Sequence, residues 1–390
     1  MNPPEHAATV PPAPVLRDGT PAEAGLDPLW TDRLVRGVRE LPEGRDPWCA
    51  GVVVLAGRGP VVAVQEAAGR AVRYERYDPG AGRGVELPPK EQEPTRVGTV
   101  FDLASLTKLC TAVAALQQAE RGTLGLDSEV AGWLPAVAPG ITVRHLLTHT
   151  SGLRPELPFY AHPGRRNQLA LLWRETAAPQ VPPGGPYLYS DLNLIVLQLV
   201  LEKITGRRLD RLVREGITGP LGMDHTAYGP LAPAGVAATE DQRRPWAKAD
   251  RGPLRGEVHD ENAWALGGVA GHAGLFSTAR DLAVLCRALL NGGTYGTARI
   301  LGPRSVAALL DPPGLGFRVD QPSFMGELAG RGAAGHTGFT GTSLVLDRAT
   351  DTFLVLLANT VHPRRGSGDS TPRAAAATRL ARAAGIRTAR

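Results

Sequence analysis

The chain has few cysteines, few lysines and no long hydrophobic stretch. Cys49, Cys110 and Cys286 are far apart and form no Cys-x-x-Cys pair, so their spacing indicates neither a zinc site nor a redox pair. No apolar run is long enough to cross a membrane, and the first thirty residues lack the basic and apolar regions of a signal peptide. We therefore expect a protein of a reducing compartment, the cytoplasm, with no membrane partner.

Although lysine is scarce, the chain is basic, because 39 arginines accompany the four lysines and the net charge is +5. The arginines are spread along the whole chain rather than clustered beside aromatic residues, which make up 5%. This distribution does not indicate a nucleic-acid-binding surface. With 390 residues, 43% of them hydrophobic, the chain can bury a substantial core as one large domain or two smaller ones.

The only Ser-x-x-Lys pattern of the chain lies in the stretch FDLASLTK, residues 101–108. Residues three apart lie on one face of a helix, so the Ser105 hydroxyl and the Lys108 amine can come within hydrogen-bonding distance. Apolar residues recur at helical intervals up to Leu116, and Asp102 is a candidate cap ahead of them. The unpaired amides of the first helical turn would favour negative charge developing at Ser105. With ten serines and four lysines the pattern arises by chance roughly once in ten such chains, so companion motifs must support it.

Hydrophobic patterns place strands near both ends of the chain and helices between them. We expect helices that begin at Asp27 and Pro28 and that cover 190–204, 277–290 and 373–385, and strands at 51–56, 61–64, 342–346 and 352–357. Residues 1–16 are proline-rich and predict a disordered tail, and residues 71–97 predict a loop. Strands from distant segments that enclose a helical middle predict one antiparallel sheet, and hence an α+β fold.

Two histidines, His145 and His149, lie four residues apart on a short predicted helix. This spacing is compatible with a metal pair, but no acidic residue stands between them in the metalloprotease pattern. We therefore favour hydrogen bonding within the fold over metal ligation.

Two further clusters have the residue types that a serine nucleophile with a lysine partner would need. The stretch YSDLN, residues 189–193, follows a Pro-Pro-Gly-Gly-Pro turn and puts a phenol and a carboxylate at the start of a helix. The stretch GHTGFTGTS, residues 335–343, is a glycine-rich lead into the penultimate strand.

In this order, the three motifs resemble those of the penicillin-recognising serine hydrolases. The branch in question contains class C β-lactamases and D-alanyl-D-alanine carboxypeptidases and also includes esterases and D-aminopeptidases. Further stretches at 146–153, 220–223 and 274–278 extend the likeness over nearly the whole chain. The resemblance implies a β-lactamase/transpeptidase-like domain over 17–390, with a discontinuous α/β part near 25–104 and 300–388 and a mostly helical part near 105–299. The active site would lie in the groove between these parts, with no cofactor.

By the same resemblance, Ser105 would attack an ester or amide carbonyl of a small-molecule substrate and form an acyl-enzyme that water resolves. Lys108 or Tyr189 would be the base, and Tyr189 the proton donor to the leaving group. The backbone amides of Ser105 and Phe339 would form the oxyanion hole, and Asp191, Thr337 and Gly338 would contact the substrate.

The sequence departs from the family pattern at two positions. His336 stands where the third motif usually begins with Lys, and Asp191 stands where the second usually ends in Asn. Both changes make the groove less positive and weaken recognition of a substrate carboxylate, so we favour an esterase-like activity over a true β-lactamase. A carboxylate beside Lys108 would also keep this lysine charged, which moves the role of base to Tyr189 or His336. We hypothesise that Tyr189 is the base and Lys108 its electrostatic partner.

The segment around His259 and Asp260 is dense in polar residues and glycine. It is either a substrate-contacting wall of the groove or a hydrogen-bonded structural turn, and we weigh the two evenly. A metal site made with His272 ranks well below both, and we expect no metal. Acyl transfer to another acceptor, a β-lactamase or carboxypeptidase activity, and a catalytically silent binding protein remain the alternatives.

Overall fold

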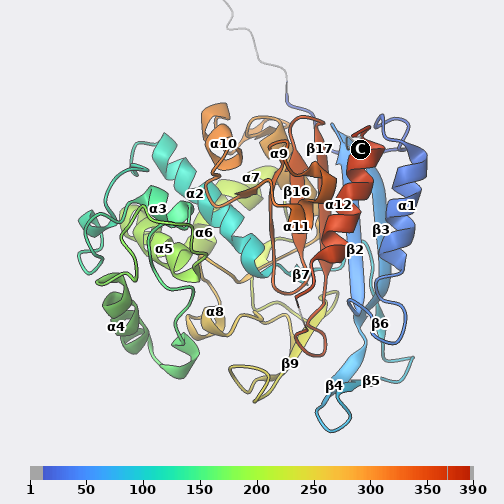
Figure 1. The fold of residues 1–390 in the computed structure, drawn as a ribbon, viewed down its shortest axis with the longest axis horizontal. Coiled ribbons are helices and arrows are strands. Elements are labelled where there is room, and N and C mark those ends of the chain that lie inside the picture. The colour runs from blue at the N-terminus through green and yellow to red at the C-terminus, as the bar shows by residue number, and fades with distance from the viewer. Residues whose placement is uncertain (1–11, 367, 387–390) are drawn as a thin grey trace, which may run out of the picture.

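A single sheet brings together strands from the two ends of the chain. The computed structural model describes residues 12–366 and 368–386, and within them the sheet has eight strands, in the order β1-β3-β2-β17-β16-β15-β14, with β6 paired to β3. Their bounds are β1 Arg17–Asp18, β2 Gly51–Arg58, β3 Val61–Val72, β6 Glu93–Pro94, β14 Arg318–Val319, β15 Ala334–Thr337, β16 Ser343–Asp347 and β17 Thr352–Ala358. All these pairings are antiparallel except that of β1 with β3. The predicted α+β fold is confirmed, and Figure 1 shows the blue and red strands side by side.

Strand β2 is apolar throughout its first six positions because both faces of the sheet are covered. Val52 and Val54 belong to the core shared with helices α1 (Pro28–Arg39) and α12 (Thr371–Ala383). Val53 and Leu55 belong to the larger core, which includes helices α2 (Thr107–Glu120) and α9 (Ala279–Leu290). Removal of this apolar surface from water is the main driving force that holds the sheet between its helices.

Helix α2, Thr107–Glu120, lies between the sheet and the helical part of the chain (Figure 1). The predicted helices at 190–204 and 277–290 are confirmed as α5 and α9. With these two, the other α-helices of the described residues are α3 Val143–Leu147, α4 Arg165–Thr176, α5 Asp191–Thr205, α6 Leu209–Val213, α7 Gly219–Leu221, α8 Glu261–Ala265, α9 Ala279–Leu290, α10 Pro303–Leu310 and α11 Pro322–Met325. No helix in the described part of the chain is long and apolar enough to cross a membrane.

Small sheets lie outside the central one. Strand β11 (Leu275–Ser277) pairs with β7 (Phe101–Asp102) and with β8 (Ala227–Tyr228), which ties the segment before Ser105 to the middle of the chain. The other pairs are β4 Tyr74–Asp78 with β5 Arg83–Glu86, β9 Ala238–Gln242 with β10 Gly252–Arg255, and β12 Thr294–Tyr295 with β13 Ala298–Arg299.

Two sequence predictions need comment. The loop predicted over 71–97 is wrong in part, because β4 and β5 form a hairpin whose turn is held by Asp78 Oδ1, the acceptor for the amides of Gly80 and Ala81. Residues 1–11 of the predicted tail lie outside the described residues. Ala13 pairs with Gly296, and Leu16 is buried, so this end of the tail is packed against the domain.

Candidate active site

Ser105 lies in a sharp turn between β7 and α2. Asp102 Oδ1 accepts the Ala104 amide at 2.8 Å, while its Oδ2 accepts the His259 amide at 2.6 Å. Ala104 has φ of +45°, in the left-handed region that residues with a Cβ seldom occupy. Asp102 therefore holds the backbone at the start of a strained 3₁₀ turn, Ala104–Leu106, and the serine comes directly after the strained residue.

The side chains of Ser105, Lys108 and Tyr189 meet in the structure. Lys108 Nζ donates to Ser105 Oγ at 2.8 Å, and the Tyr189 hydroxyl donates to the same oxygen at 3.0 Å. The one-turn spacing of serine and lysine accounts for the first contact. Tyr189 comes from the segment just before α5, 84 residues away, so only the tertiary fold creates the second.

Lys108 is fully buried and carries a positive charge. Its Nζ lies 2.8 Å from Asp191 Oδ1 in an ion pair and donates to the His272 carbonyl oxygen at 3.2 Å. Burial alone would lower the pKa of Lys108, but the negative charge of Asp191 and the oxygen of Tyr189 outweigh it and raise this pKa above its ordinary value. In this arrangement Lys108 is an ammonium at neutral pH and cannot accept the serine proton.

His149 fixes the ring of Tyr189. The two rings stack with centroids 4.8 Å apart, and His149 Nδ1 accepts the Ser190 amide at 3.1 Å. Burial and the nearby charge of Lys108 lower the pKa of His149 to about 3, so the imidazole is neutral. His145 Nδ1 lies 3.1 Å from the Gly140 carbonyl oxygen, so both histidines make the hydrogen bonds within the fold that the sequence favoured.

His336 is buried against the same site. Its Nδ1 lies 2.7 Å from the Thr337 carbonyl oxygen, which fixes the proton on Nδ1, and its Nε2 has no hydrogen-bond partner among the described residues. Burial, followed by the charge of Lys108, lowers the pKa of His336 to about 3. His336 is therefore a weak base at neutral pH.

The loop after β15 is held against the serine turn. Thr340 Oγ1 donates to the Asp102 carbonyl oxygen at 2.7 Å, and a Cβ added to Gly338 would lie 2.4 Å from the Leu103 carbonyl oxygen. Ser105 lies in the first turn of its 3₁₀ helix, where a backbone N–H has no acceptor within the helix, and within residues 12–366 and 368–386 the Phe339 amide donates to no backbone acceptor. Ser105 and Phe339 both line the same cleft, so their amides are candidate donors of an oxyanion hole.

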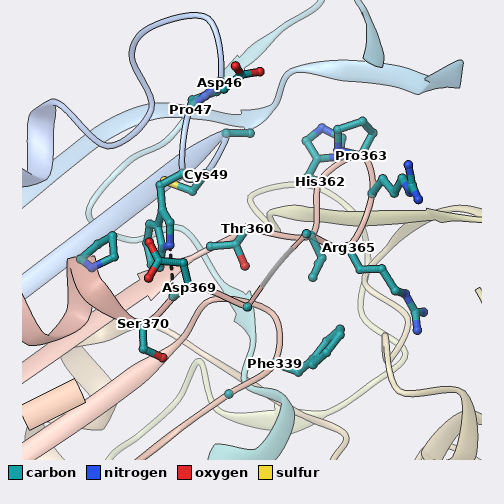
Figure 2. A pocket seen from close by; sticks show the side chains of 18 of the residues that line it. Asp46, Pro47, Cys49, Phe339, Thr360, His362, Pro363, Arg365, Asp369 and Ser370 are labelled. Atoms are coloured by element: carbon teal, nitrogen blue, oxygen red, sulfur yellow. Dashed lines mark hydrogen bonds between the residues drawn. The ribbon is translucent and has the colours of Figure 1, made fainter. Parts of the chain in front are cut away.

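A cleft of about 880 Å³ opens above the serine. Ser105, Tyr189, His336, Thr337, Gly338 and Phe339 all line it. Figure 2 shows one part of it, with Asp369 and Ser370 on one side and Phe339 and Arg365 on the other. Six arginines line the walls, against the two carboxylates of Asp46 and Asp369: Arg45, Arg83, Arg318, Arg364, Arg365 and Arg373. The sequence missed this positive wall, because nothing distinguishes these six from the other arginines of the chain.

Comparison with known proteins identifies the family of the chain. A family model described as Beta-lactamase matches residues 32–378. The chain belongs to the beta-lactamase family. A relative in Escherichia coli (strain K12), named putative D-alanyl-D-alanine carboxypeptidase, is 33% identical over 389 residues, which cover 90% of this chain and 86% of the relative.

Solved structures share the beta-lactamase fold. EstCE1, described as a hydrolase with promiscuous acyltransferase activity, superposes with a TM-score of 0.67 at 24% identity, over 90% of this chain and 99% of its own. A class C beta lactamase from Rhodobacter sphaeroides gives a TM-score of 0.66 at 21% identity, over 90% and 98%. At these identities the two structures show the fold alone. The resemblance expected from the three motifs is confirmed, and the family is one of serine hydrolases.

Three residues predicted to contact substrate do not line the cleft of this beta-lactamase family member. Asp191 is engaged by Lys108 instead. His259 is buried, with Nε2 2.8 Å from Glu240 Oε2 and its ring stacked on Phe339 at 5.5 Å. Asp260 Oδ1 accepts the Ala263 amide at 2.7 Å and caps α8. The structural-turn interpretation of this segment therefore fits better than the substrate wall.

Asp191, Asp260 and His272 also bring possible metal-ligand atoms within 4.8 Å of one another. The Lys108 ammonium already contacts Asp191, and it donates to the His272 carbonyl oxygen. A metal cation there would meet this positive charge at short range, so the residues fit a buried lysine better than a metal ion.

Proposed function

We propose that this chain is a serine acyl hydrolase that opens an ester or amide through an acyl-enzyme on Ser105. One observation carries the proposal: Ser105 Oγ lies 2.8 Å from Lys108 Nζ and 3.0 Å from the Tyr189 oxygen, at the wall of a cleft. Next to Ser105 Oγ stand a cation, Lys108, and a side chain, Tyr189, that can accept the serine proton when it is the phenolate, and a nucleophile needs both.

The charges of the site support Tyr189 as the base. In this step Tyr189 reacts as its phenolate, so the hydrogen bond between the two oxygens runs from Ser105 to Tyr189. Ser105 Oγ attacks the acyl carbon, and its proton passes to the phenolate oxygen, which becomes the neutral phenol. The positive charge of Lys108, 5.0 Å from the centre of the Tyr189 ring, attracts the negative phenolate oxygen. The carbonyl oxygen becomes an oxyanion beside the amides of Ser105 and Phe339. Tyr189 then protonates the departing alcohol or amine, and water releases the acid by the same steps.

We propose an ester as the substrate, or an amide without a nearby carboxylate. The imidazole of His336 is neutral, so the third motif provides no cation for a substrate carboxylate, and the charge of Lys108 is neutralised by Asp191. The esterase-like choice rests on these two positions.

A second candidate is a carboxypeptidase-type activity on a peptide that ends in a carboxylate. Arg318 of β14 lines the cleft, and its guanidinium is close enough to His336 to contribute to that histidine's lowered pKa. Arginine binds carboxylates in a bidentate geometry, so Arg318 can replace the cation missing at His336. The name of the Escherichia coli relative, putative D-alanyl-D-alanine carboxypeptidase, is consistent with this candidate.

Two measurements test the proposal. Intact-mass detection of a fluorophosphonate adduct on the native chain, absent from Ser105→Ala, is expected if the chain is an acyl hydrolase. Complete lack of an adduct on the native chain would favour a silent binding protein. Rates with p-nitrophenyl esters, nitrocefin and a D-alanyl-D-alanine peptide then rank the substrates. Faster hydrolysis of the peptide than of the esters would select the carboxypeptidase candidate, and faster hydrolysis of nitrocefin would overturn both.

A further inference from the structure

Arg373 is a buried cation in an unfavourable place. It is 6% exposed and lies in the first turn of α12, where the positive end of the helix dipole disfavours a cation. Within the described residues no carboxylate comes within ion-pair distance of it; the charge of Asp369 acts on it from farther away. Burial lowers the pKa of Arg373 to about 10, so the guanidinium remains charged at neutral pH. Burial of a charged guanidinium without a carboxylate partner is unfavourable, so Arg373 needs other contacts that stabilise its charge.

The contacts of Arg373 point to the loop after β15. Its Nη2 donates to the Gly338 carbonyl oxygen at 3.1 Å, and its Nη1 donates to Ser370 Oγ at 3.0 Å. The guanidinium also lies over the ring of Trp48 at 5.4 Å, and Trp48 Nε1 donates to the Asp369 carbonyl oxygen at 3.0 Å. Trp48 and Ser370 thus hold the guanidinium in place.

The Gly338 carbonyl and the Phe339 amide belong to one planar peptide group. Because the C=O and N–H of a trans peptide point in opposite directions, a donor fixed on the carbonyl oxygen also fixes the direction of the N–H. A charged donor polarises the peptide as well, which makes the N–H a stronger hydrogen-bond donor. Arg373 therefore acts on the carbonyl side of the same peptide group whose N–H belongs to Phe339, which lines the cleft together with Ser105.

We infer that Arg373 is a positioning residue for the oxyanion hole: it orients and polarises the Gly338–Phe339 peptide group so that the Phe339 amide stabilises the negative oxygen of the tetrahedral intermediate. This inference rests on the proposed function. It requires no contact between Arg373 and the substrate, although Arg373 also lines the cleft. A role in binding an anionic substrate would instead affect only substrates that carry a negative charge.

The test uses Arg373→Gln, Arg373→Lys and, as a control, Arg379→Gln. Arg379 lies on the same helix but packs against Gly37 of α1, outside the cleft, and its replacement removes the same charge. The rate of fluorophosphonate adduct formation and the affinity for a neutral boronic acid both depend on the oxyanion hole and need no knowledge of the substrate. Melting temperatures are recorded for every variant.

We expect Arg373→Gln to slow adduct formation by about 10- to 100-fold and to weaken boronic acid binding by a similar factor. With a neutral ester, kcat should fall while KM stays within about threefold. Arg373→Lys should recover part of the loss, and Arg379→Gln should match the native chain.

Unchanged adduct rate and boronic acid affinity in Arg373→Gln would overturn the inference while leaving the proposed function intact. A loss confined to KM for anionic substrates would also overturn it, in favour of substrate binding. Equal losses in Arg379→Gln would mean that net charge, and not the peptide contact, is responsible. If the native chain itself forms no adduct, the proposed function fails and the inference with it.

Discussion

The ion pair between Lys108 and Asp191 determines which side chain can take the proton of Ser105. Because Asp191 raises the pKa of Lys108, the folded-state value lies above the unfolded one. The stabilisation from this pair is therefore fully present below the ordinary pKa of lysine and is lost only as the pH rises through the raised value. Lys108 stays charged across the physiological range, and His336, with a pKa of about 3, is a weak base. Tyr189 is the remaining candidate.

Replacing Tyr189 by Phe should lower the rate of acylation by about 10²- to 10⁴-fold, since it removes the proton acceptor but keeps the ring that stacks on His149. His336→Asn should cost less than about tenfold, because a neutral imidazole is replaced by a neutral amide. Pre-steady-state kinetics with a p-nitrophenyl ester measures both. Normal acylation in Tyr189→Phe, together with loss of acylation in His336→Asn, would reassign the base to His336.

Gly338 lies where the loop after β15 meets the serine turn. A Cβ there would lie 2.0 Å from Thr342 Oγ1 and 2.4 Å from the Leu103 carbonyl oxygen, and the second atom is backbone that cannot move away cheaply. Gly338→Ala should therefore shift the Phe339 amide and lower kcat by about 100-fold with a neutral ester. Gly98→Ala is the control, because a Cβ at Gly98 meets nothing within 4 Å. Native kcat in Gly338→Ala would mean that the Phe339 amide has no part in catalysis.

The site residues that could be identified from the sequence all lie in short motifs. The residue types in these motifs and the order of the motifs along the chain are enough to indicate a catalytic role. Ser105, Lys108 and Tyr189 were found in this way, and the effect of Asp191 on Lys108 followed from charge alone. Arg318 and Arg373 were missed, because an arginine acquires its role only when the fold places it beside His336 or Gly338.

Individual helices and strands could be predicted where burial of the element leaves a pattern of apolar residues in its own sequence. The apolar run at 51–56 predicted a buried strand, since both faces of β2 are covered. The hairpin of β4 and β5 was missed because these strands lie at the surface and most of their residues are polar, so no apolar pattern marks them. Strand β3 has twelve residues, but the sequence predicted a strand only over the first four, because the apolar run ends there.

Helix α1 offers a test at the level of one element. Asp27, its N-cap, accepts the Leu29 amide at 2.8 Å through Oδ1, and Pro28 follows at the first helical position. Asp27→Ala should lower the free energy of unfolding by about 1 kcal/mol, because one amide of the first turn loses its acceptor. Asp27→Asn keeps an acceptor and should lose much less.

Urea denaturation measures the free energy of unfolding of both Asp27 variants. Their kcat/KM should be unchanged, because α1 packs on the opposite face of the sheet from the larger core that contains α2. A loss of stability equal in Asp27→Asn and Asp27→Ala would mean that the charge, and not the cap, stabilises this helix end.

Across the whole molecule, one buried network connects segments that are far apart in the chain. Glu240 is fully buried on β9; its Oε2 lies 2.8 Å from His259 Nε2, and Arg365 donates to both of its oxygens at 2.6–2.9 Å. Arg365 also contacts Glu261, just after the segment of His259. The network thus joins the loop after β17 to the segment whose His259 amide is bound by Asp102, ahead of Ser105.

Acid should weaken this network through Glu240. Burial alone would raise the pKa of Glu240, but the hydrogen bonds from His259 and Arg365 outweigh it and lower the pKa to about 2. A carboxyl whose pKa is lower in the folded state contributes stability above its unfolded value, and that contribution is lost as the pH falls through the folded value. The shift corresponds to about 3 kcal/mol, present at neutral pH and lost between about pH 5 and pH 2.

Glu240→Gln should therefore be less stable than the native chain at pH 7, and the difference should shrink as the pH falls from 5 to 2, because protonation of the native Glu240 removes the same charge. Urea denaturation across this range measures the difference. Glu43→Gln, at an exposed carboxylate without an ion pair in the described chain, should follow the native curve throughout. If the difference for Glu240→Gln stayed constant down to pH 2, its origin would be packing rather than charge, and the network would not explain acid sensitivity.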